Sequence, residues 1–224
     1  MTTSSWTCDL TLRDLIADNL ARFPVRRATV DDAHHAAVAI TITDVGHGAD
    51  LPGLPQYAAW QNQAALLLTR RAASLRKHAG QWAFPGGRLD PGETPIQTAL
   101  REMHEEIAVA LEQDRVLGYL DDFVTRSGFV MTPVVVWGGA GVRTVPSPEE
   151  VASVHRIPLS EFLREDAPML EAADSSDHPV LRMPVGDDHI AAPTAALIYQ
   201  FREVCLLGRE TRVAHFEQPE FAWR

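Results

Sequence analysis

The stretch GGRLDPGETPIQTALREMHEEIAV, residues 86–109, combines a glycine turn, a helix and a cluster of glutamates. Thr94 predicts the start of the helix, because its hydroxyl can accept a hydrogen bond from a free N–H of the first turn. Pro95 suits the first helical position, where a missing N–H costs nothing. Gln97, three residues after Thr94, completes a capping box. We therefore expect a helix that begins at Pro95.

The predicted helix has an apolar face and an acidic face. Its apolar residues recur at spacings of three and four; they are Ile96, Ala99, Leu100, Met103 and Ile107. Glu102, Glu105 and Glu106 share the opposite side, where like charges cost roughly 0.2–0.5 kcal/mol per pair in an isolated helix. A solvated face is the simplest interpretation of such a cluster. Oxygen ligands on one rigid face also suit a hard cation such as Mg²⁺ or Mn²⁺, and the adjacent Arg101 favours this second interpretation.

Two turn signals precede the helix. They are Pro85-Gly86-Gly87 and Asp90-Pro91-Gly92. Glycine lets the backbone approach a ligand closely and offers a carbonyl to it. The Gly87 carbonyl is therefore a candidate metal ligand, and Glu93, which closes the second turn, is another.

These residues resemble the Nudix hydrolase signature, G-x5-E-x7-R-E-U-x-E-E-x-G-U, in which U is a bulky apolar residue. The matching residues are Gly87, Glu93, Arg101, Glu102, Met103, Glu105, Glu106 and Val109. Ala108 stands where the signature has glycine. That glycine would end the helix in a left-handed conformation, which costs a non-glycine residue roughly 1–2 kcal/mol. We therefore expect the helix to end differently here, although no carboxylate is lost.

The resemblance implies an α/β fold, namely a Nudix-type α/β/α sandwich with a mixed β-sheet and a loop-helix-loop catalytic motif. The implied ligands of Mg²⁺ or Mn²⁺ are Glu102, Glu106, Glu105, Glu93 and the Gly87 carbonyl. Glu105 and Glu106 are also implied as catalytic residues, and one of the site glutamates, or a later acid such as Glu149, would deprotonate the attacking water. Arg101 would orient a glutamate through a salt bridge. Glu149 and Glu150 lie where Nudix enzymes often carry a further acid as ligand or base, and a solvated loop acid is the alternative interpretation of either.

Residues 67–87, LLTRRAASLRKHAGQWAFPGG, resemble a narrower signature of coenzyme A pyrophosphatases, L-L-T-x-R/T-S/A-x3-R-x3-G-x3-F-P-G-G. Arginine suits bidentate phosphate contacts, and the predicted substrate-binding residues are Arg70, Arg71, Arg76 and Arg88. Pairing of these arginines with nearby acids is the alternative. The implied reaction hydrolyses the diphosphate of coenzyme A or a derivative, which gives adenosine 3′,5′-bisphosphate and 4′-phosphopantetheine or its acyl form.

Composition excludes several other classes of protein. The net charge of −10 makes the chain a poor general binder of nucleic acid or of an anionic membrane. Cys8 and Cys205 lie far apart in the sequence, which argues against a disulfide framework or a zinc site. The N-terminus lacks the pattern of a signal peptide, and the apolar runs are too short to span a bilayer. We therefore expect a cytoplasmic protein.

The expected organisation has three parts: an N-terminal helix and extension over residues 1–30, a Nudix domain over 31–207, and a tail over 208–224. Expected strands cover residues 36–44, 64–70, 116–121 and 129–137, and a loop covers 45–60. Pro133 suggests that its strand is at an edge or carries a bulge. Helices are expected over 10–23 and 193–207. The aromatic tail leaves open whether it packs on its own core or in a homodimer.

Three alternative functions remain open at this point. The nearest is a Nudix enzyme that acts on another nucleoside diphosphate derivative, such as ADP-ribose or a dinucleotide. A non-catalytic module that binds a nucleotide is a different class, for which Ala108 is the only support. A structural acidic protein is the third reading.

Overall fold

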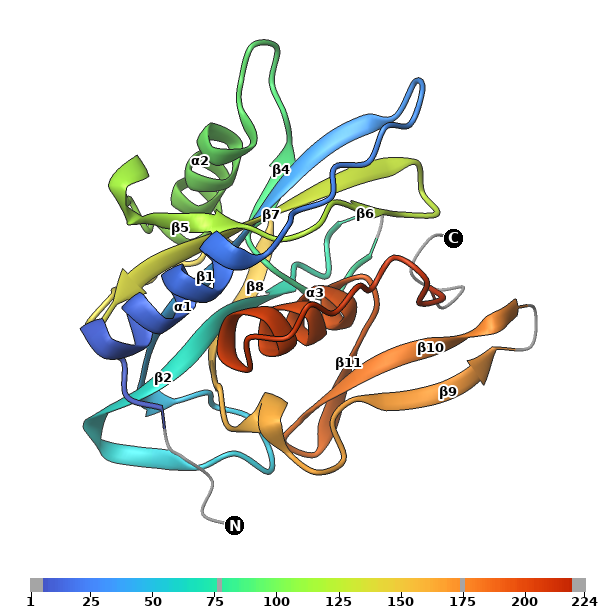
Figure 1. Ribbon diagram of the computed structural model, residues 1–224. Helices are drawn as coiled ribbons and strands as arrows, with labels where there is room; N and C mark the ends of the chain where they lie inside the picture. Colours follow the sequence, from blue (N-terminus) through green and yellow to red (C-terminus); the bar gives the residue numbers. More distant parts are fainter. Residues whose placement is uncertain (1–5, 76–77, 174–175, 219–224) are drawn as a thin grey trace.

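The computed structural model describes residues 6–75, 78–173 and 176–218 (Figure 1). An eight-stranded sheet forms its centre, with the strand order β3-β2-β1-β7-β5 along its longest path. The strands are β1 (His34–Gly48), β2 (Gln56–Arg71), β3 (Trp82–Ala83), β4 (Gly86–Arg88), β5 (Val116–Tyr119), β6 (Phe123–Val124), β7 (Phe129–Gly139) and β8 (Val151–Pro158). β1 and β7 pair in parallel, whereas β2 and β4 pair with β1 in the antiparallel sense, so the sheet is mixed.

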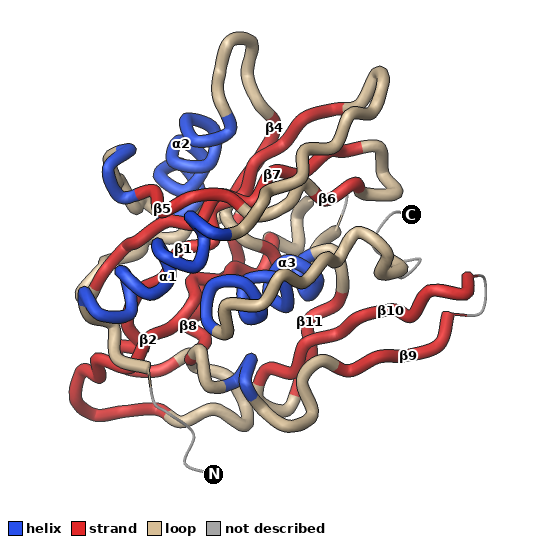
Figure 2. Tube along the Cα trace, viewed as in Figure 1, coloured by secondary structure: helices blue, strands red, loops and turns tan. Residues whose placement is uncertain are grey.

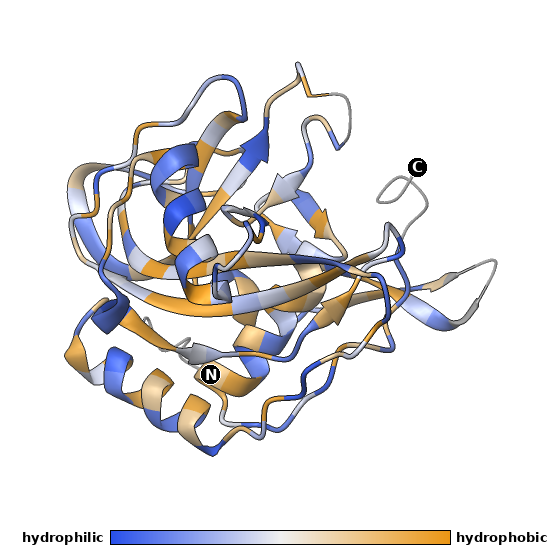
Figure 3. Ribbon diagram, turned by 90° about the horizontal axis from the view of Figure 1, so that it is seen from above, coloured by the Kyte–Doolittle hydropathy of each residue, from blue (hydrophilic) through white to orange (hydrophobic). Residues whose placement is uncertain are grey.

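Helices cover both faces of this sheet (Figure 2). They are α1 (Leu10–Arg22), α2 (Pro95–Ile107) and α3 (Thr194–Phe201), the last of which continues as a π-helical turn over Arg202–Leu206. Successive side chains of a strand point to opposite faces. Ala37 and Ala39 of β1 accordingly join the core under α2, while Val38 and Ile40 join the larger core that contains residues of α1 and α3. The predicted α/β/α sandwich is confirmed, and the hydrophobic segments of its ribbons are visible in Figure 3.

A smaller antiparallel sheet lies beside α3 (Figure 1). It comprises β9 (Met169–Ala173), β10 (Ser176–Val185) and β11 (Asp188–Ala191). Leu181, Met183 and Ile190 of this sheet are buried in the same core as α3. The smaller sheet is therefore packed on the sandwich. No helix among the described residues has the length and apolar character needed to cross a bilayer.

The predicted loop over residues 45–60 is wrong for most of its length. β1 continues to Gly48 and β2 begins at Gln56. The register between the two strands shifts at Gly46 and again at Gly48, whose φ angles are 61° and 109°. Glycine adopts such angles freely. The glycines that suggested a loop therefore lie at β-bulges within the paired strands.

Pro133 lies on an inner strand rather than at an edge. β7 pairs with β1 on one side and with β5 and β6 on the other. The Pro133 carbonyl accepts a hydrogen bond of 3.2 Å from the Leu120 N–H, where β5 gives way to β6. The missing N–H of proline therefore falls at a break in the neighbouring strands.

Candidate active site

The helix α2 begins as its sequence predicts. The Thr94 hydroxyl accepts a hydrogen bond from the Gln97 N–H at 3.3 Å, and the Gln97 side chain accepts one from the Thr94 N–H at 2.9 Å. Pro95 occupies the first helical position. This reciprocal cap fixes where the first turn of the helix starts, and with it the faces on which the glutamates lie.

The expectation that the helix ends differently at Ala108 is wrong. Ala108 adopts the left-handed conformation, with φ 56° and ψ 28°. Its N–H donates to the His104 carbonyl at 2.9 Å, and the Val109 N–H donates to the Met103 carbonyl at 3.4 Å. These bonds satisfy the last carbonyls of the helix, so an alanine takes the backbone conformation that the signature glycine would take.

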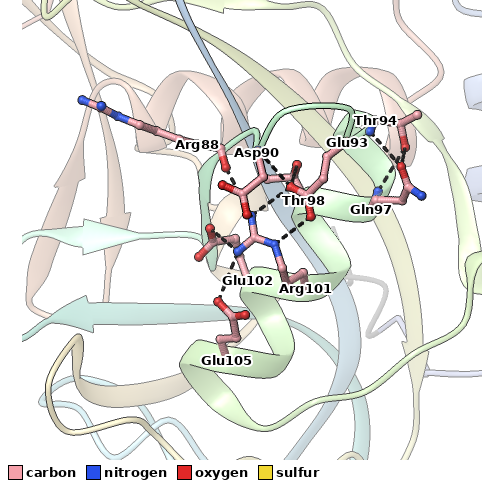
Figure 4. Close-up of polar contacts among 9 residues, drawn as sticks. All are labelled: Arg88, Asp90, Glu93, Thr94, Gln97, Thr98, Arg101, Glu102 and Glu105. Carbon is pink, nitrogen blue, oxygen red and sulfur yellow. Dashed lines mark hydrogen bonds and ion pairs between the residues drawn. The ribbon is translucent and has the colours of Figure 1, made fainter.

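Arg101 lies at the centre of a network of carboxylates (Figure 4). Its Nε lies 2.8 Å from Glu93, and its Nη1 lies 2.8 Å from Glu102 and 3.1 Å from Glu105. Thr98 also donates to Glu93, at 2.7 Å. The hydrogen bonds from Arg101 and then from Thr98 lower the pKa of Glu93 to about 2. Arg101 thus holds Glu93 and Glu105, and it also contacts Glu102 from one side.

A second group of carboxylates lies on the other side of Glu102. One oxygen each of Glu102, Glu106 and Glu150 lies within 4.8 Å of the others. Glu106 is only 5% exposed. Burial, followed by the charge of Glu102, raises the pKa of Glu106 to about 8, although a hydrogen bond from the Gly86 backbone opposes this shift. Burial also raises the pKa of Glu102.

Glu150 reaches this group because its loop is fastened to two elements. The Ser147 N–H donates to the Glu106 carbonyl at 2.8 Å, at the end of α2. The Glu150 carbonyl accepts from the Ala72 N–H at 2.8 Å, where β2 ends. Glu150, rather than Glu149, is therefore the later acid beside the helix. Local sequence patterns do not single out Glu150. Its position depends on the pairing of Arg71 with Val151, a long-range contact between β2 and β8.

Gly87 lies against the same carboxylates. A Cβ atom at this position would lie 2.2 Å from Oε1 of Glu102, which is far below any van der Waals contact. β4 carries Gly87 beside β1, with Gly87 paired to Ala37. The absence of a side chain at residue 87 therefore leaves the room that the Glu102 carboxylate occupies.

A cavity of about 310 Å³ opens beside the glycine turn, and for brevity we call it the first cavity. Gly86, Gly87 and Arg71 contribute to its wall. Arg88 also lines it, and its guanidinium lies 4.9 Å from the centre of the Phe129 ring. Figure 4 shows the Arg88 side chain directed away from Arg101. Apolar residues form much of the remaining wall; they include Val38, Phe84, Met131 and Leu197.

The predicted substrate-binding arginines separate into two groups. Arg71 and Arg88 line the first cavity, and the charge of Arg71 acts on Glu106, since it lowers the pKa of that carboxyl. Arg70 lines a different cavity and pairs with Asp188, which does not line that cavity, at 2.5 Å. Arg76 lies outside the described residues. His78 also lines the first cavity.

The triad of Glu102, Glu106 and Glu150 fits a hard divalent cation. Three carboxylates provide the oxygen donors that Mg²⁺ and Mn²⁺ prefer. A buried carboxylate beside two others is strongly disfavoured in its charged form unless a cation compensates it. The donor set and the raised pKa of Glu106 therefore both suit a bound cation at this position.

Comparison with known proteins identifies the family to which the chain is similar. A family model described as the NUDIX domain matches residues 57–179. A protein of Yersinia enterocolitica named "Uncharacterized Nudix hydrolase NudL" is 42% identical over 134 residues, which cover 59% of this chain and 60% of that protein. Its namesake in Pectobacterium atrosepticum is 52% identical over 97 residues, which cover 43% of this chain and 50% of that protein. The chain thus spans about half of the length of these curated relatives.

The fold has counterparts among solved structures. The crystal structure of a MutT/nudix family protein from Enterococcus faecalis superposes with a TM-score of 0.52 at 16% sequence identity, covering 79% of this chain and 64% of that one. At this identity the likeness concerns the fold alone. Because the family match takes in more than half of the chain and includes the capped, glutamate-bearing helix, the chain belongs to the NUDIX domain family.

Proposed function

We propose that this chain is a metal-dependent hydrolase that cleaves the diphosphate bond of coenzyme A or its derivatives. The products are adenosine 3′,5′-bisphosphate and 4′-phosphopantetheine, or its acyl form. The observation that carries the hydrolase proposal is the convergence of Glu102, Glu106 and Glu150 next to the glycine turn. The coenzyme A proposal rests on the resemblance of residues 67–87 to the narrower signature.

Each residue of the site has a role in this proposal. Glu102, Glu106 and Glu150 would hold Mg²⁺ or Mn²⁺. A cation there would neutralise the charge of a diphosphate and lower the pKa of water. Arg101 positions Glu102 through its ion pair at 2.8 Å. Arg101 also forms ion pairs with Glu93 and Glu105. In this proposal those two glutamates hold Arg101 in position and are not metal ligands.

The first cavity offers a binding surface of mixed character for the substrate. Arg71 and Arg88 would contact the phosphates, because one guanidinium group can donate two parallel hydrogen bonds to the oxygens of one phosphate. The apolar wall beyond them would accept a part of the substrate that carries no charge. The base that activates water would be one of the site glutamates.

Incubation with coenzyme A and Mn²⁺, followed by identification of the products by mass, tests the proposal. We expect adenosine 3′,5′-bisphosphate and 4′-phosphopantetheine in equal amounts. The Glu106→Gln variant should lose roughly 10²–10⁴-fold in turnover. Glu112→Gln, an exposed change just beyond the same helix, is its matched control and should keep wild-type turnover.

Competition between substrates decides the specificity. Preferred cleavage of ADP-ribose or of a dinucleotide at equal concentration would contradict the coenzyme A proposal and leave the hydrolase proposal standing. Binding of nucleotide without any hydrolysis in Mg²⁺ or Mn²⁺ would contradict both, and it would favour a non-catalytic module.

A further inference from the structure

A second cavity, of about 200 Å³, adjoins the first. The two share part of their walls, namely Gln81, Trp82, Pro193 and Thr194. The first cavity in turn reaches Gly87, which contacts Glu102 of the proposed metal site. A ligand whose diphosphate lay at the glutamates could therefore extend through the first cavity toward the second.

The titratable residues that line the second cavity are all basic among the described part of the chain. They are Arg70, Arg182 and His189, with no aspartate or glutamate in the wall. Arg182 and His189 come from β10 and β11 of the smaller sheet. Both lie beyond residue 179, where the match to the family ends, and outside both sequence signatures.

Neighbouring groups hold the two guanidiniums in place. Arg70 stacks on the Trp82 ring at 3.9 Å, donates to the Gly80 carbonyl at 3.0 Å and pairs with Asp188, outside the wall, at 2.5 Å. Arg182 donates from Nε to Glu171 at 2.9 Å and from Nη1 to Nε2 of His189 at 2.6 Å. A guanidinium carries five N–H donors, so these two contacts leave Arg182 with donors for a ligand. Such fixed donors bind an anion with less loss of side-chain freedom.

We propose that the second cavity binds a further anionic group of the substrate, distinct from the diphosphate. This inference rests on the proposed function, because it names a second subsite of the same substrate. The group is a phosphate monoester or a carboxylate at the far end of the ligand. On coenzyme A these correspond to the 3′-phosphate and to the carboxylate of a dicarboxylic acyl thioester.

Two substitutions that break the same ion pair test this inference. Arg182→Gln removes the cation, whereas Glu171→Gln removes its exposed partner and keeps the cation. We expect Arg182→Gln to raise KM for the anionic substrate about tenfold with little change in kcat. Glu171→Gln should leave KM unchanged or lower it. If the pair is only structural, both variants will change KM equally, and that result would overturn the inference.

The choice of substrate identifies the anionic group. If it is the 3′-phosphate, the tenfold effect of Arg182→Gln disappears with 3′-dephospho-coenzyme A. If it is a carboxylate, the effect persists with a dephosphorylated succinyl thioester and is absent with the acetyl thioester. An effect of the same size on all four substrates would contradict an anion subsite.

A binding measurement separates this inference from the proposed function. Titration calorimetry measures the affinity of the wild type and of both variants for adenosine 3′,5′-bisphosphate and for inorganic phosphate. Neither compound contains a diphosphate, so no hydrolysis accompanies binding. Loss of phosphate binding in Arg182→Gln alone would support the subsite even if coenzyme A were not hydrolysed. Equal phosphate binding by all three proteins, together with an unchanged KM, would overturn the subsite even if coenzyme A were hydrolysed.

Discussion

At the residue scale, Glu106 is the most unfavourably placed carboxylate of the site. Its folded-state pKa of about 8 exceeds the ordinary value of 4.5. Between these values the metal-free folded protein binds more protons than the unfolded chain, so its stability falls as the pH rises from about 4.5 through 8. Glu106→Gln removes this titration because its side chain is neutral at every pH.

We therefore expect a pH-dependent difference in Tm between Glu106→Gln and the wild type in the presence of a chelator. The variant should melt at nearly the wild-type temperature at about pH 5 and clearly higher at about pH 9. Thermal melts at both pH values measure this difference. Mg²⁺ should raise the wild-type Tm at the higher pH and leave that of the variant unchanged. The same difference in Tm at both pH values would show that burial of this carboxyl is not the cause.

Gly87 permits a second prediction at this scale. The atom that an alanine Cβ would meet is the end of a flexible side chain, Oε1 of Glu102. Gly87→Ala should therefore fold with a Tm close to that of the wild type, while the Glu102 carboxylate moves. We expect the affinity for Mn²⁺ to fall about 10–100-fold, the range for disturbed support of a metal ligand. Calorimetric titration with Mn²⁺ measures it, and unchanged affinity would show that Glu102 tolerates the shift.

At the scale of elements, the end of α2 stores strain at Ala108. A left-handed alanine destabilises the folded state by roughly 1–2 kcal/mol. Glycine removes this strain but destabilises the folded state by roughly 0.5–1 kcal/mol, because its unfolded chain has more conformational entropy to lose. Ala108→Gly should therefore raise the free energy of unfolding by up to about 1.5 kcal/mol. Urea denaturation measures this change. Ala110→Gly, at a residue without a positive φ, is the control and should not stabilise the protein.

The elements that sequence patterns predicted best are those with local causes. The cap at Thr94, the proline at the start of α2 and its apolar stripe all act within a few residues, and each is confirmed. The same local reasoning was wrong for residues 45–60, because the bulges at Gly46 and Gly48 depend on pairing with another strand. It also left Glu150 among two loop acids, since only the fold brings that residue to Glu106.

At the scale of the whole molecule, Asp121 joins segments from the two ends of the described chain. Its carboxylate accepts hydrogen bonds from the Arg26 N–H at 2.7 Å, from Gln200 at 2.9 Å and from Arg212 at 2.8 Å. Arg212 also donates to the Pro24 carbonyl at 3.0 Å. The segments that follow α1 and α3 are thus connected through one buried carboxylate, a contact that sequence patterns alone do not predict.

Asp121→Ala should accordingly lower the free energy of unfolding by about 3–5 kcal/mol, because it removes the buried acceptor shared by the Arg26 N–H, Gln200 and the Arg212 guanidinium. Chemical denaturation measures the loss. Glu210→Ala is the matched control, since it removes the exposed partner of the same Arg212, and it should cost about 1 kcal/mol or less. Similar losses in the two variants would mean that the buried contact contributes no more than the exposed one.

Trp82 gives the molecule an optical property of its own. Its indole forms part of the wall of both cavities and lies under the Arg70 guanidinium. Occupancy of either cavity would alter the electric field at the ring, and with it the wavelength and intensity of its emission. In a variant whose other four tryptophans are replaced by phenylalanine, intrinsic fluorescence would follow ligand entry in real time without any attached dye.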